Sequence, residues 1–307
     1  MRRTTILLLQ AALCLSFSSV QAGMLPVEPN VTEVTRQLIR WYDAQKTDKP
    51  VYLSSQAEGE AFIDWLASWN TAVVDSFSTR LKKKEAPSPV LWNTYKETEQ
   101  QLWRRFQVFK KNHEKYKIHI TFNNDPVLVP VVKKVEAFFY EVYPMIHERY
   151  GKRGGNEGWE VYVRFDPELT NVPAYASDGK LTFSNEWFKK NPNDIGVLTH
   201  EAIHLLQKDY QRGVPGWLVE GMADYIRHTY KKIAHEAFPL PADTKTRNYT
   251  DAYRVTARFL NWMEVQSPGF NDYLHHRMMR ERYNEAMIEE KMGMGLDALW
   301  QLYAAEQ

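Results

Sequence analysis

The stretch THEAIHLLQ, residues 199–207, carries His200, Glu201 and His204 in the order His-Glu-x-x-His. Histidines four residues apart share one face of a helix, so their two imidazoles can chelate a single metal ion. The helical repeat turns Glu201 about 100° away from His200, which puts its carboxylate beside such an ion rather than on it. The stretch therefore predicts either a metal-binding helix or an ordinary amphipathic helix with two half-buried histidines.

A third ligand would separate these two interpretations, because catalytic zinc usually has three protein ligands and one position open to water. Glu220 lies in PGWLVEGMADYIRH, residues 215–228, and follows His204 after 15 intervening residues, enough for a loop and a returning helix. Asp224 comes one helical turn later, where its carboxylate could accept a hydrogen bond from a ligating imidazole and fix its tautomer. The alternative arrangement places Asp224 on the metal instead of Glu220.

The other residues around the motif exclude one scheme and add no further ligand. A metzincin site needs Gly three positions and His six positions after the second histidine, but Gln207 and Tyr210 stand there. Four histidines at helix ends or in polar runs are predicted to lie on the surface: His228, His235, His275 and His276.

The segments before the motif predict an α+β fold with a small mixed sheet. Alternating polar and apolar residues indicate strands over 117–122 and 159–165, with a long helix over 127–150 between them. Segments 172–177 and 180–184 flank Asp178-Gly179, which is typical of a hairpin turn. The chain after Pro192 is expected to be helical, with Asn193 or Asp194 capping the motif helix near Ile195.

Residues 23–116 are predicted to form an N-terminal helical region rich in tryptophan. Apolar residues recur at helical spacing over 31–44, 58–81 and 91–109, and Pro87 and Pro89 separate the last two segments. The tryptophans are interpreted as core residues rather than a ligand platform. The role of this region stays open.

Residues 1–22 read as a signal peptide. Arg2 and Arg3 precede a short apolar run, and Val20-Gln21-Ala22 is typical of a cleavage site that would leave Gly23 as the first mature residue. A membrane anchor is the alternative, but the apolar run is too short to span a bilayer. Cys14, the only cysteine of the chain, would leave with this segment, which favours a secreted or periplasmic protein without disulfides.

The composition limits which kinds of binding partner the protein can be expected to have. The chain has 307 residues, 44% hydrophobic and 25% charged, with 39 basic and 38 acidic side chains. Loss of Arg2 and Arg3 would turn the net charge from +1 to −1. This near-neutral balance gives no support for nucleic-acid or anionic-membrane partners, and no stretch after residue 22 is long and apolar enough for an integral membrane helix.

Three stretches together carry a family resemblance. GVLTHEAIHLLQ (196–207), PGWLVEGMADYIRH (215–228) and YTDAYRVTARFLNWM (249–263) resemble the basic secretory proteins of plants and bacteria, a family of zinc peptidases related to the gluzincins. LDALWQLY (296–303) is similar to the ending of that family. The resemblance covers about residues 117–303 and implies a zincin-like catalytic domain over 117–307, although the mature chain is not basic.

The resemblance also implies roles for individual residues. His200, His204 and Glu220 would be zinc ligands, Glu201 the general base for a zinc-activated water, and Asp224 an outer partner of a ligating imidazole. Related peptidases place a tyrosine or histidine donor opposite the base to stabilise the oxyanion. On the segment 248–262, expected to be one helix, Tyr253 is the first candidate and Tyr249 the second, while a tyrosine packed in the core is the alternative.

The resulting prediction is a secreted zinc-dependent metallopeptidase that acts on peptides or proteins, with endopeptidase and aminopeptidase activity both open. Segment 180–184, as an edge strand, could align an extended substrate by backbone hydrogen bonds. One alternative is a secreted zinc- or glycan-binding protein with a structural or inactive metal site, suggested by the tryptophan-rich N-terminal region. Another is hydrolysis of a non-peptide amide.

Overall fold

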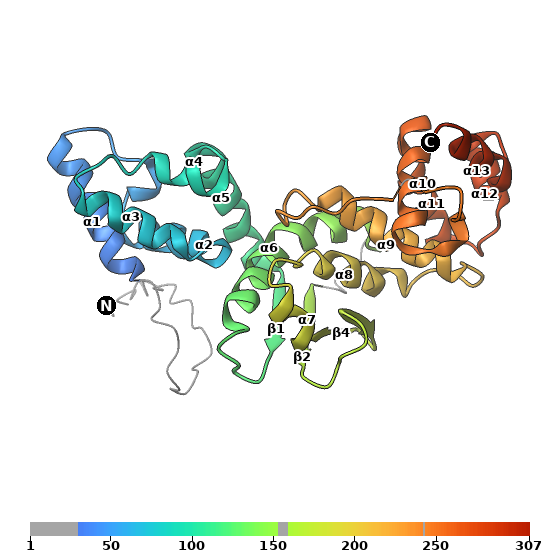
Figure 1. The fold of residues 1–307 in the computed structure, drawn as a ribbon, viewed down its shortest axis with the longest axis horizontal. Coiled ribbons are helices and arrows are strands. Elements are labelled where there is room, and N and C mark those ends of the chain that lie inside the picture. Colours follow the sequence, from blue (N-terminus) through green and yellow to red (C-terminus); the bar gives the residue numbers. More distant parts are fainter. Residues whose placement is uncertain (1–29, 153–158, 242) are drawn as a thin grey trace, which may run out of the picture.

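The computed structural model describes residues 30–152, 159–241 and 243–307, and it has three parts in a row (Figure 1). A group of N-terminal helices lies at one end and the last helices lie at the other. Between them, the long helix α6 and the helices α8 and α9 lie above a small sheet. The predicted signal peptide, residues 1–22, lies outside the described residues.

The N-terminal part is all helical and ends where the sheet begins, at Tyr116. Asn30, Ser55 and Thr98 each accept a hydrogen bond from a backbone N–H three residues on and so cap the helices that follow them. The elements are α1 (Val31–Gln45), η1 (Val51–Leu53), α2 (Gln56–Trp69), α3 (Ala72–Lys82), α4 (Pro89–Tyr95) and α5 (Glu99–Lys115).

Two predicted helices of this part are each divided in the structure. Asn70 is extended and its side chain accepts from the backbone N–H of Ala72, so the helix expected over 58–81 becomes α2 and α3. Lys96 adopts a left-handed conformation that ends α4, and Thr98 then starts α5 with a capping box, which divides the segment 91–109.

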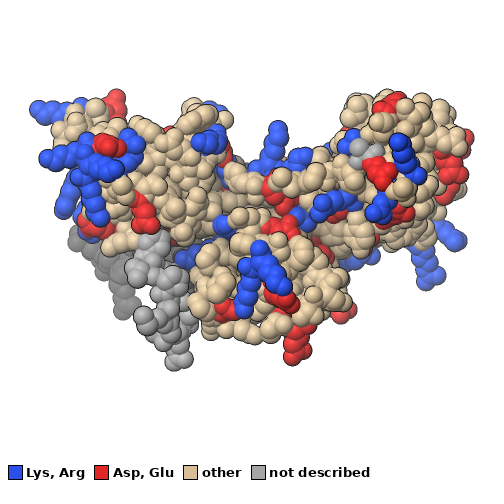
Figure 2. Space-filling view, viewed as in Figure 1, with Lys and Arg blue, Asp and Glu red and all other residues tan. Residues whose placement is uncertain are grey.

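Most N-terminal tryptophans contribute to the core rather than to an open platform. Trp65 and Trp69 are buried, Trp41 and Trp103 pack partly buried against the core, and Trp92 is exposed. Lysine and arginine side chains gather over this end of the molecule, whereas charges of both signs intermix elsewhere on the face in Figure 2.

The sheet has four strands in the order β1-β2-β4-β3. The strands are β1 (Lys117–Thr121), β2 (Glu160–Asp166), β3 (Ala174–Ser177) and β4 (Lys180–Ser184). β1, β2 and β4 are parallel, while β3 pairs antiparallel with β4 across the turn at Asp178 and Gly179. Both residues have positive φ, as a two-residue hairpin turn requires. The expectation that segment 180–184 is an edge strand is wrong, because β3 covers its outer edge.

Helices cover one face of the sheet and provide the frame of the candidate site. α6 (Val129–Tyr150) contacts β1, α7 (Asn185–Lys190) contacts β4, and α8 (Val197–Gln207) contacts both β3 and β4. In β2, Val161, Val163 and Phe165 are buried, whereas the alternate residues of the strand are exposed or half-buried. α6 also packs against α8, α2 and α5, which makes it the central support of the molecule.

The C-terminal part continues from α9 and packs back against it. Its elements are α9 (Gly216–Tyr230), η2 (Tyr249–Asp251), α10 (Tyr253–Gln266), α11 (Phe270–Arg280), α12 (Ala286–Met292) and α13 (Leu296–Ala305). α9 lies against both α8 and α10. No helix in the described ranges is long and apolar enough to cross a bilayer. The architecture is thus a mixed α+β fold with many helices and one small mixed sheet.

Candidate metal centre

The motif helix α8 is buried along most of its length. Leu198, Ala202 and Ile203 pack into the core, which turns His200, Glu201 and His204 toward α9. Asn193 and Asp194 do not cap this helix as expected. Gly196 holds the N-cap position, and the described residues supply no side-chain cap there.

Three side chains from two successive helices meet at one point. The Nε2 atom of His200 lies 3.2 Å from Nε2 of His204 and 3.2 Å from Oε2 of Glu220. The distance from His204 Nε2 to the same Glu220 oxygen is 3.5 Å. Over the part of the chain that the structure describes, these residues form the one group of three whose donor atoms could hold a metal ion.

The size of this triangle fits a tetrahedral ion. With ligand bonds of about 2.0–2.1 Å, two donors of a tetrahedral zinc site stand about 3.3 Å apart. The three observed separations lie close to that value. Two imidazoles and one carboxylate are also a donor set that catalytic zinc sites use. The residues present therefore fit a divalent metal with one further position left for a fourth ligand.

Asp224 lies behind His200 rather than in the triangle. Its Oδ1 is 2.7 Å from Nδ1 of His200, and both residues are buried. The imidazole therefore donates from Nδ1 and directs Nε2 at the other donors. Burial alone would lower the pKa of His200, but the bonds to Asp224 and Glu220 outweigh it and raise the pKa to about 9. Burial would raise the pKa of Glu220, yet the two imidazoles lower it to about 2.

His204 has a different outer partner, Gln207, which was not among the predicted site residues. Its Nδ1 lies 2.6 Å from Oε1 of Gln207, and the Nε2 of Gln207 donates to the backbone oxygen of Val219 at 3.0 Å. Gln207 therefore joins α8 to the residue that precedes Glu220. The spacing of three residues between His204 and Gln207 was the available signal, since side chains at that spacing are neighbours on a helix.

Glu201 is buried beside the triangle of donor atoms from His200, His204 and Glu220. This position follows from the helical repeat, which rotates Glu201 about 100° away from His200. Burial raises the pKa of its carboxyl group, opposed by the nearby imidazoles of His200 and His204. A carboxylate held in this way binds a proton more readily than an exposed one, which suits a group that accepts and returns a proton.

A buried arginine, Arg227, connects α9 to the start of α8. The guanidinium of Arg227 on α9 contacts Asp194, just before α8, and donates to both oxygens of Glu236. A Cβ at position 196 would overlap the carboxylate of Glu236, so a larger residue at the start of α8 would displace that carboxylate. This ion-pair network fixes the beginning of the motif helix relative to α9.

The two tyrosine candidates occupy different places. Tyr253 is 54% exposed, and its ring lies nearly parallel to that of His200 with 6.2 Å between centroids. Burial, and then the charges of Glu220, Asp224 and Glu201, raise the pKa of its phenol. Tyr249 instead donates to Asp297 at 2.7 Å and packs edge-on against Trp217 and Trp300. The structure brings Tyr253 close to the candidate metal ligand His200 and places Tyr249 in an aromatic packing contact.

The backbone at Tyr253 is unusual. Ala252 has φ 62° and ψ −172°, and Tyr253 has φ 48°, so two consecutive non-glycine residues have positive φ. Such conformations cost about 1–3 kcal/mol each and cluster at functional sites. They interrupt the helix expected over 248–262, and they set the phenol of Tyr253 beside His200.

The match with known proteins covers the part of the chain that contains this cluster. Residues 175–303 match the BSP family, peptidases of plants and bacteria. The resemblance drawn from the sequence is confirmed over this segment, which starts later than the expected residue 117. No curated protein and no solved structure matches the chain.

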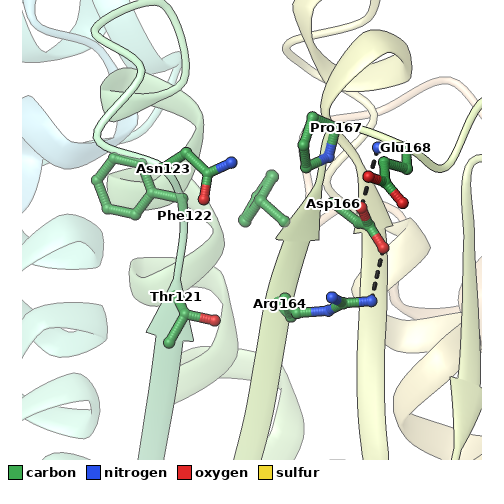
Figure 3. A pocket seen from close by; sticks show the side chains of 8 residues that line it. Thr121, Phe122, Asn123, Arg164, Asp166, Pro167 and Glu168 are labelled. Atoms are coloured by element: carbon green, nitrogen blue, oxygen red, sulfur yellow. Dashed lines mark hydrogen bonds and ion pairs between the residues drawn. The ribbon is translucent and has the colours of Figure 1, made fainter.

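The BSP segment runs from β3 to α13 and so includes every side chain of the cluster. A cavity of about 310 Å³ lies outside this segment, at the carboxyl ends of β1 and β2 (Figure 3). Two of its polar side chains pair with each other: Arg164 donates to Asp166 at 2.5 Å, and Asp166 also accepts the backbone N–H of Glu168. Its lining, as far as the structure describes it, contains none of the cluster residues.

One of the remaining histidines departs from the prediction. His275, expected on the surface, is fully buried on α11. Its imidazole faces Tyr210 and the backbone oxygen of Tyr150, at 2.8 and 2.7 Å. Burial lowers the pKa of His275 to about 4, so the ring is neutral at physiological pH. The polar residues His276 and Arg277 that follow it in the sequence concealed this burial.

Proposed function

We propose that the protein is a secreted, zinc-dependent peptidase whose metal is held by His200, His204 and Glu220. The observation that carries the proposal is the donor triangle with edges of 3.2, 3.2 and 3.5 Å, within a segment that matches a peptidase family. Bound zinc would supply Lewis acidity at the scissile carbonyl and lower the pKa of a coordinated water toward 7.

The protein side chains supply proton transfer and orientation. Glu201 is the general base: its carboxylate takes a proton from the attacking water and later returns it to the leaving amine. Asp224 holds the Nδ1 proton of His200, which keeps the Nε2 lone pair available as a ligand. The exposed phenol of Tyr253, whose ring lies beside that of His200, is the proposed hydrogen-bond donor to the oxyanion.

The edge strand β3 supports a peptide as the substrate. β3 contacts the metal-binding helix α8, and its only partner strand in the described sheet is β4. An extended chain can add to such an edge through backbone hydrogen bonds, and its scissile bond would then lie along the helix that carries the cluster.

Substitution of Glu201 by Gln tests the assigned chemistry. The variant should retain stoichiometric zinc but lose peptide-library cleavage by several orders of magnitude, because an amide cannot accept the proton. Glu289→Gln, an exposed carboxylate on α12, is the control and should cleave normally. A chelator should abolish wild-type activity and added zinc should restore it. Full cleavage by Glu201→Gln would remove this residue from the mechanism, and zinc binding without any cleavage by the wild type would favour a binding protein.

Secretion belongs to the same proposal and rests on the sequence of residues 1–22. The exported chain should begin at Gly23, which N-terminal sequencing of the mature protein would establish. An exported chain that retains Arg2 and Arg3 would instead support a membrane anchor.

A further inference from the structure

A short loop after α9 connects the N-terminal helices with the helices around the candidate metal centre. Its residues His235, Glu236 and Phe238 contact three different parts of the molecule. His235 lies on the surface, as predicted, and faces the N-terminal helices. Its imidazole meets the ring of Trp69 edge-on with 5.4 Å between centroids, and its Nε2 lies 3.5 Å from Nη1 of Arg105. Because a guanidinium only donates, the imidazole nitrogen accepts here.

The backbone of this loop directs the imidazole toward the N-terminal helices. His235 has φ 53°, in the left-handed region that favours glycine. Its N–H donates to the backbone oxygen of Lys232, and the N–H of Glu236 donates to that of Lys231. These two bonds close the turn as in a Schellman motif, in which glycine is the usual left-handed residue. A histidine is less favourable than glycine in this conformation, and its contacts with the N-terminal helices offset that cost.

The next residue of the loop faces the motif helix. Glu236 accepts two hydrogen bonds from Arg227, at 3.0 and 2.9 Å. Its carboxylate also lies so close to Gly196, at the start of α8, that a Cβ there would overlap it. His235 and Glu236 are neighbours in a closed turn, so a shift of the imidazole moves the carboxylate that lies against α8.

The same loop reaches the start of α10. Phe238 is buried, and the guanidinium groups of Arg227 and Arg254 lie over its ring at 4.2 and 4.6 Å. Its backbone oxygen lies 2.9 Å from Nδ1 of His228 on α9. Arg254 directly follows Tyr253, the proposed oxyanion donor. The loop therefore contacts the elements that carry the groups around the cluster.

We propose that His235 is a positioning residue through which the N-terminal helices hold the starts of α8 and α10 in place. The N-terminal helices are then a permanent part of the catalytic unit and not a detachable propeptide or a separate binding module. The imidazoles of the cluster are held independently by Asp224 and Gln207. Loss of the His235 imidazole should therefore leave zinc in place and misalign Glu201 and Tyr253.

Substitution of His235 by Gly tests this inference, which rests on the proposed function. Glycine accepts the left-handed backbone, so the turn keeps its shape and only the contacts with Trp69 and Arg105 are lost. The kcat for peptide cleavage should fall about tenfold at unchanged zinc stoichiometry, because a small misplacement of reacting groups lowers the rate strongly. Lys46→Gly is the matched control: Lys46 also has a left-handed backbone, with φ 51° at the end of α1, and its substitution should leave kcat unchanged.

Hydrogen exchange of the zinc-free protein, measured by mass spectrometry, separates the support of α8 from catalysis. In His235→Gly the amides of residues 196–202 should exchange faster than in the wild type, whereas Lys46→Gly should not change them. Unchanged exchange, or an unchanged kcat in an active enzyme, would overturn the inference and leave the proposed function intact. If the wild-type protein cleaves no peptide, the proposed function fails, and faster exchange in His235→Gly would still establish that the N-terminal helices support α8.

Discussion

At the scale of single residues, the two imidazoles of the cluster are held by different kinds of partner. Asp224 behind His200 is a carboxylate, whereas Gln207 behind His204 is a neutral amide. In the metal-free protein two lone pairs and a carboxylate oxygen would face one another within 3.5 Å. A proton on His200 relieves that repulsion, and the bonds to Asp224 and Glu220, which outweigh burial, raise the pKa of the ring. A metal ion that binds at the proposed site must therefore displace this proton.

This competition predicts a pH-dependent zinc affinity. The pKa of His200 is about 9 without metal, so the ring is protonated below that pH and neutral above it. As the pH falls from 9 to 7, the apparent dissociation constant should rise by about tenfold per pH unit, because one proton is released for each zinc bound. Titration with a competing chelator at several pH values measures the slope.

Asp224→Asn serves as the comparison for this titration. Loss of the carboxylate lowers the pKa of His200, so the proton competes less and the slope above pH 7 should flatten. A wild-type affinity that is constant between pH 7 and 9 would contradict the assignment of the proton to this site.

The residues of the triangle and the partner Asp224 could be predicted from spacing, while contacts between distant segments could not. His200 and His204 share a helix, and Glu220 and Asp224 share the next one, so each pair has a local signature. His275 is separated from Tyr210 by 64 residues in the sequence, and only tertiary packing brings α11 beside the segment that follows α8. Tyr253 reaches the cluster through two positive φ angles that no local pattern of apolar residues indicates.

At the scale of helices and strands, the close approach of α9 and α10 sets the position of Tyr253. Gly221, next to Glu220, faces Thr256, one turn after Tyr253 on α10. A Cβ at position 221 would overlap the side chain of Thr256. Thr256 is buried and its hydroxyl donates to the backbone oxygen of Tyr249. The contact therefore couples the candidate metal ligand Glu220 to the candidate oxyanion donor Tyr253.

Gly221→Ala should destabilise the protein by about 1–3 kcal/mol, because the added methyl group forces α10 away from α9. It should also reduce kcat more than zinc affinity, since Tyr253 moves with α10 while Glu220 stays on α9. Gly216→Ala, on the first turn of the same helix with open space around its Cβ, is the matched control and should change neither quantity. Urea unfolding and steady-state kinetics provide the two measurements, and unchanged stability in Gly221→Ala would show that the helices can separate without cost.

Element types were easier to predict from the sequence than element ends and neighbours. Alternation and the Asp178-Gly179 turn indicated the strands correctly, since both signals are local. The N-terminal helices are divided at Asn70 and at Lys96, which adopts a left-handed conformation. The spacing of apolar residues does not indicate either break. The order of strands in the sheet arises from long-range pairing, so the edge position of β3 was not available from the sequence.

At the scale of the whole molecule, a buried ion pair connects the N-terminal helices to α6, which packs against the motif helix α8. Glu141 on α6 is buried and accepts hydrogen bonds from Trp69 on α2 and from Arg105 on α5. Arg105 also contacts Glu97, and its guanidinium lies over the rings of Trp65 and Trp69. Because α6 packs on α8, this buried ion pair connects the N-terminal part to the frame of the motif helix.

Arg105→Ala should therefore lower the free energy of unfolding by about 3–5 kcal/mol, because it leaves the carboxylate of Glu141 buried without its cation. The double variant Arg105→Ala, Glu141→Gln removes the orphaned charge, keeps an acceptor for Trp69 and should recover a large part of this loss. Lys110→Ala is the control: its ion pair with Glu58 lies between side chains that are 42% and 28% exposed, and its loss should cost less than about 1 kcal/mol. Urea unfolding followed by tryptophan fluorescence measures all three. If Arg105→Ala were no less stable than Lys110→Ala, the N-terminal helices would be held to α6 by apolar packing and not by this ion pair.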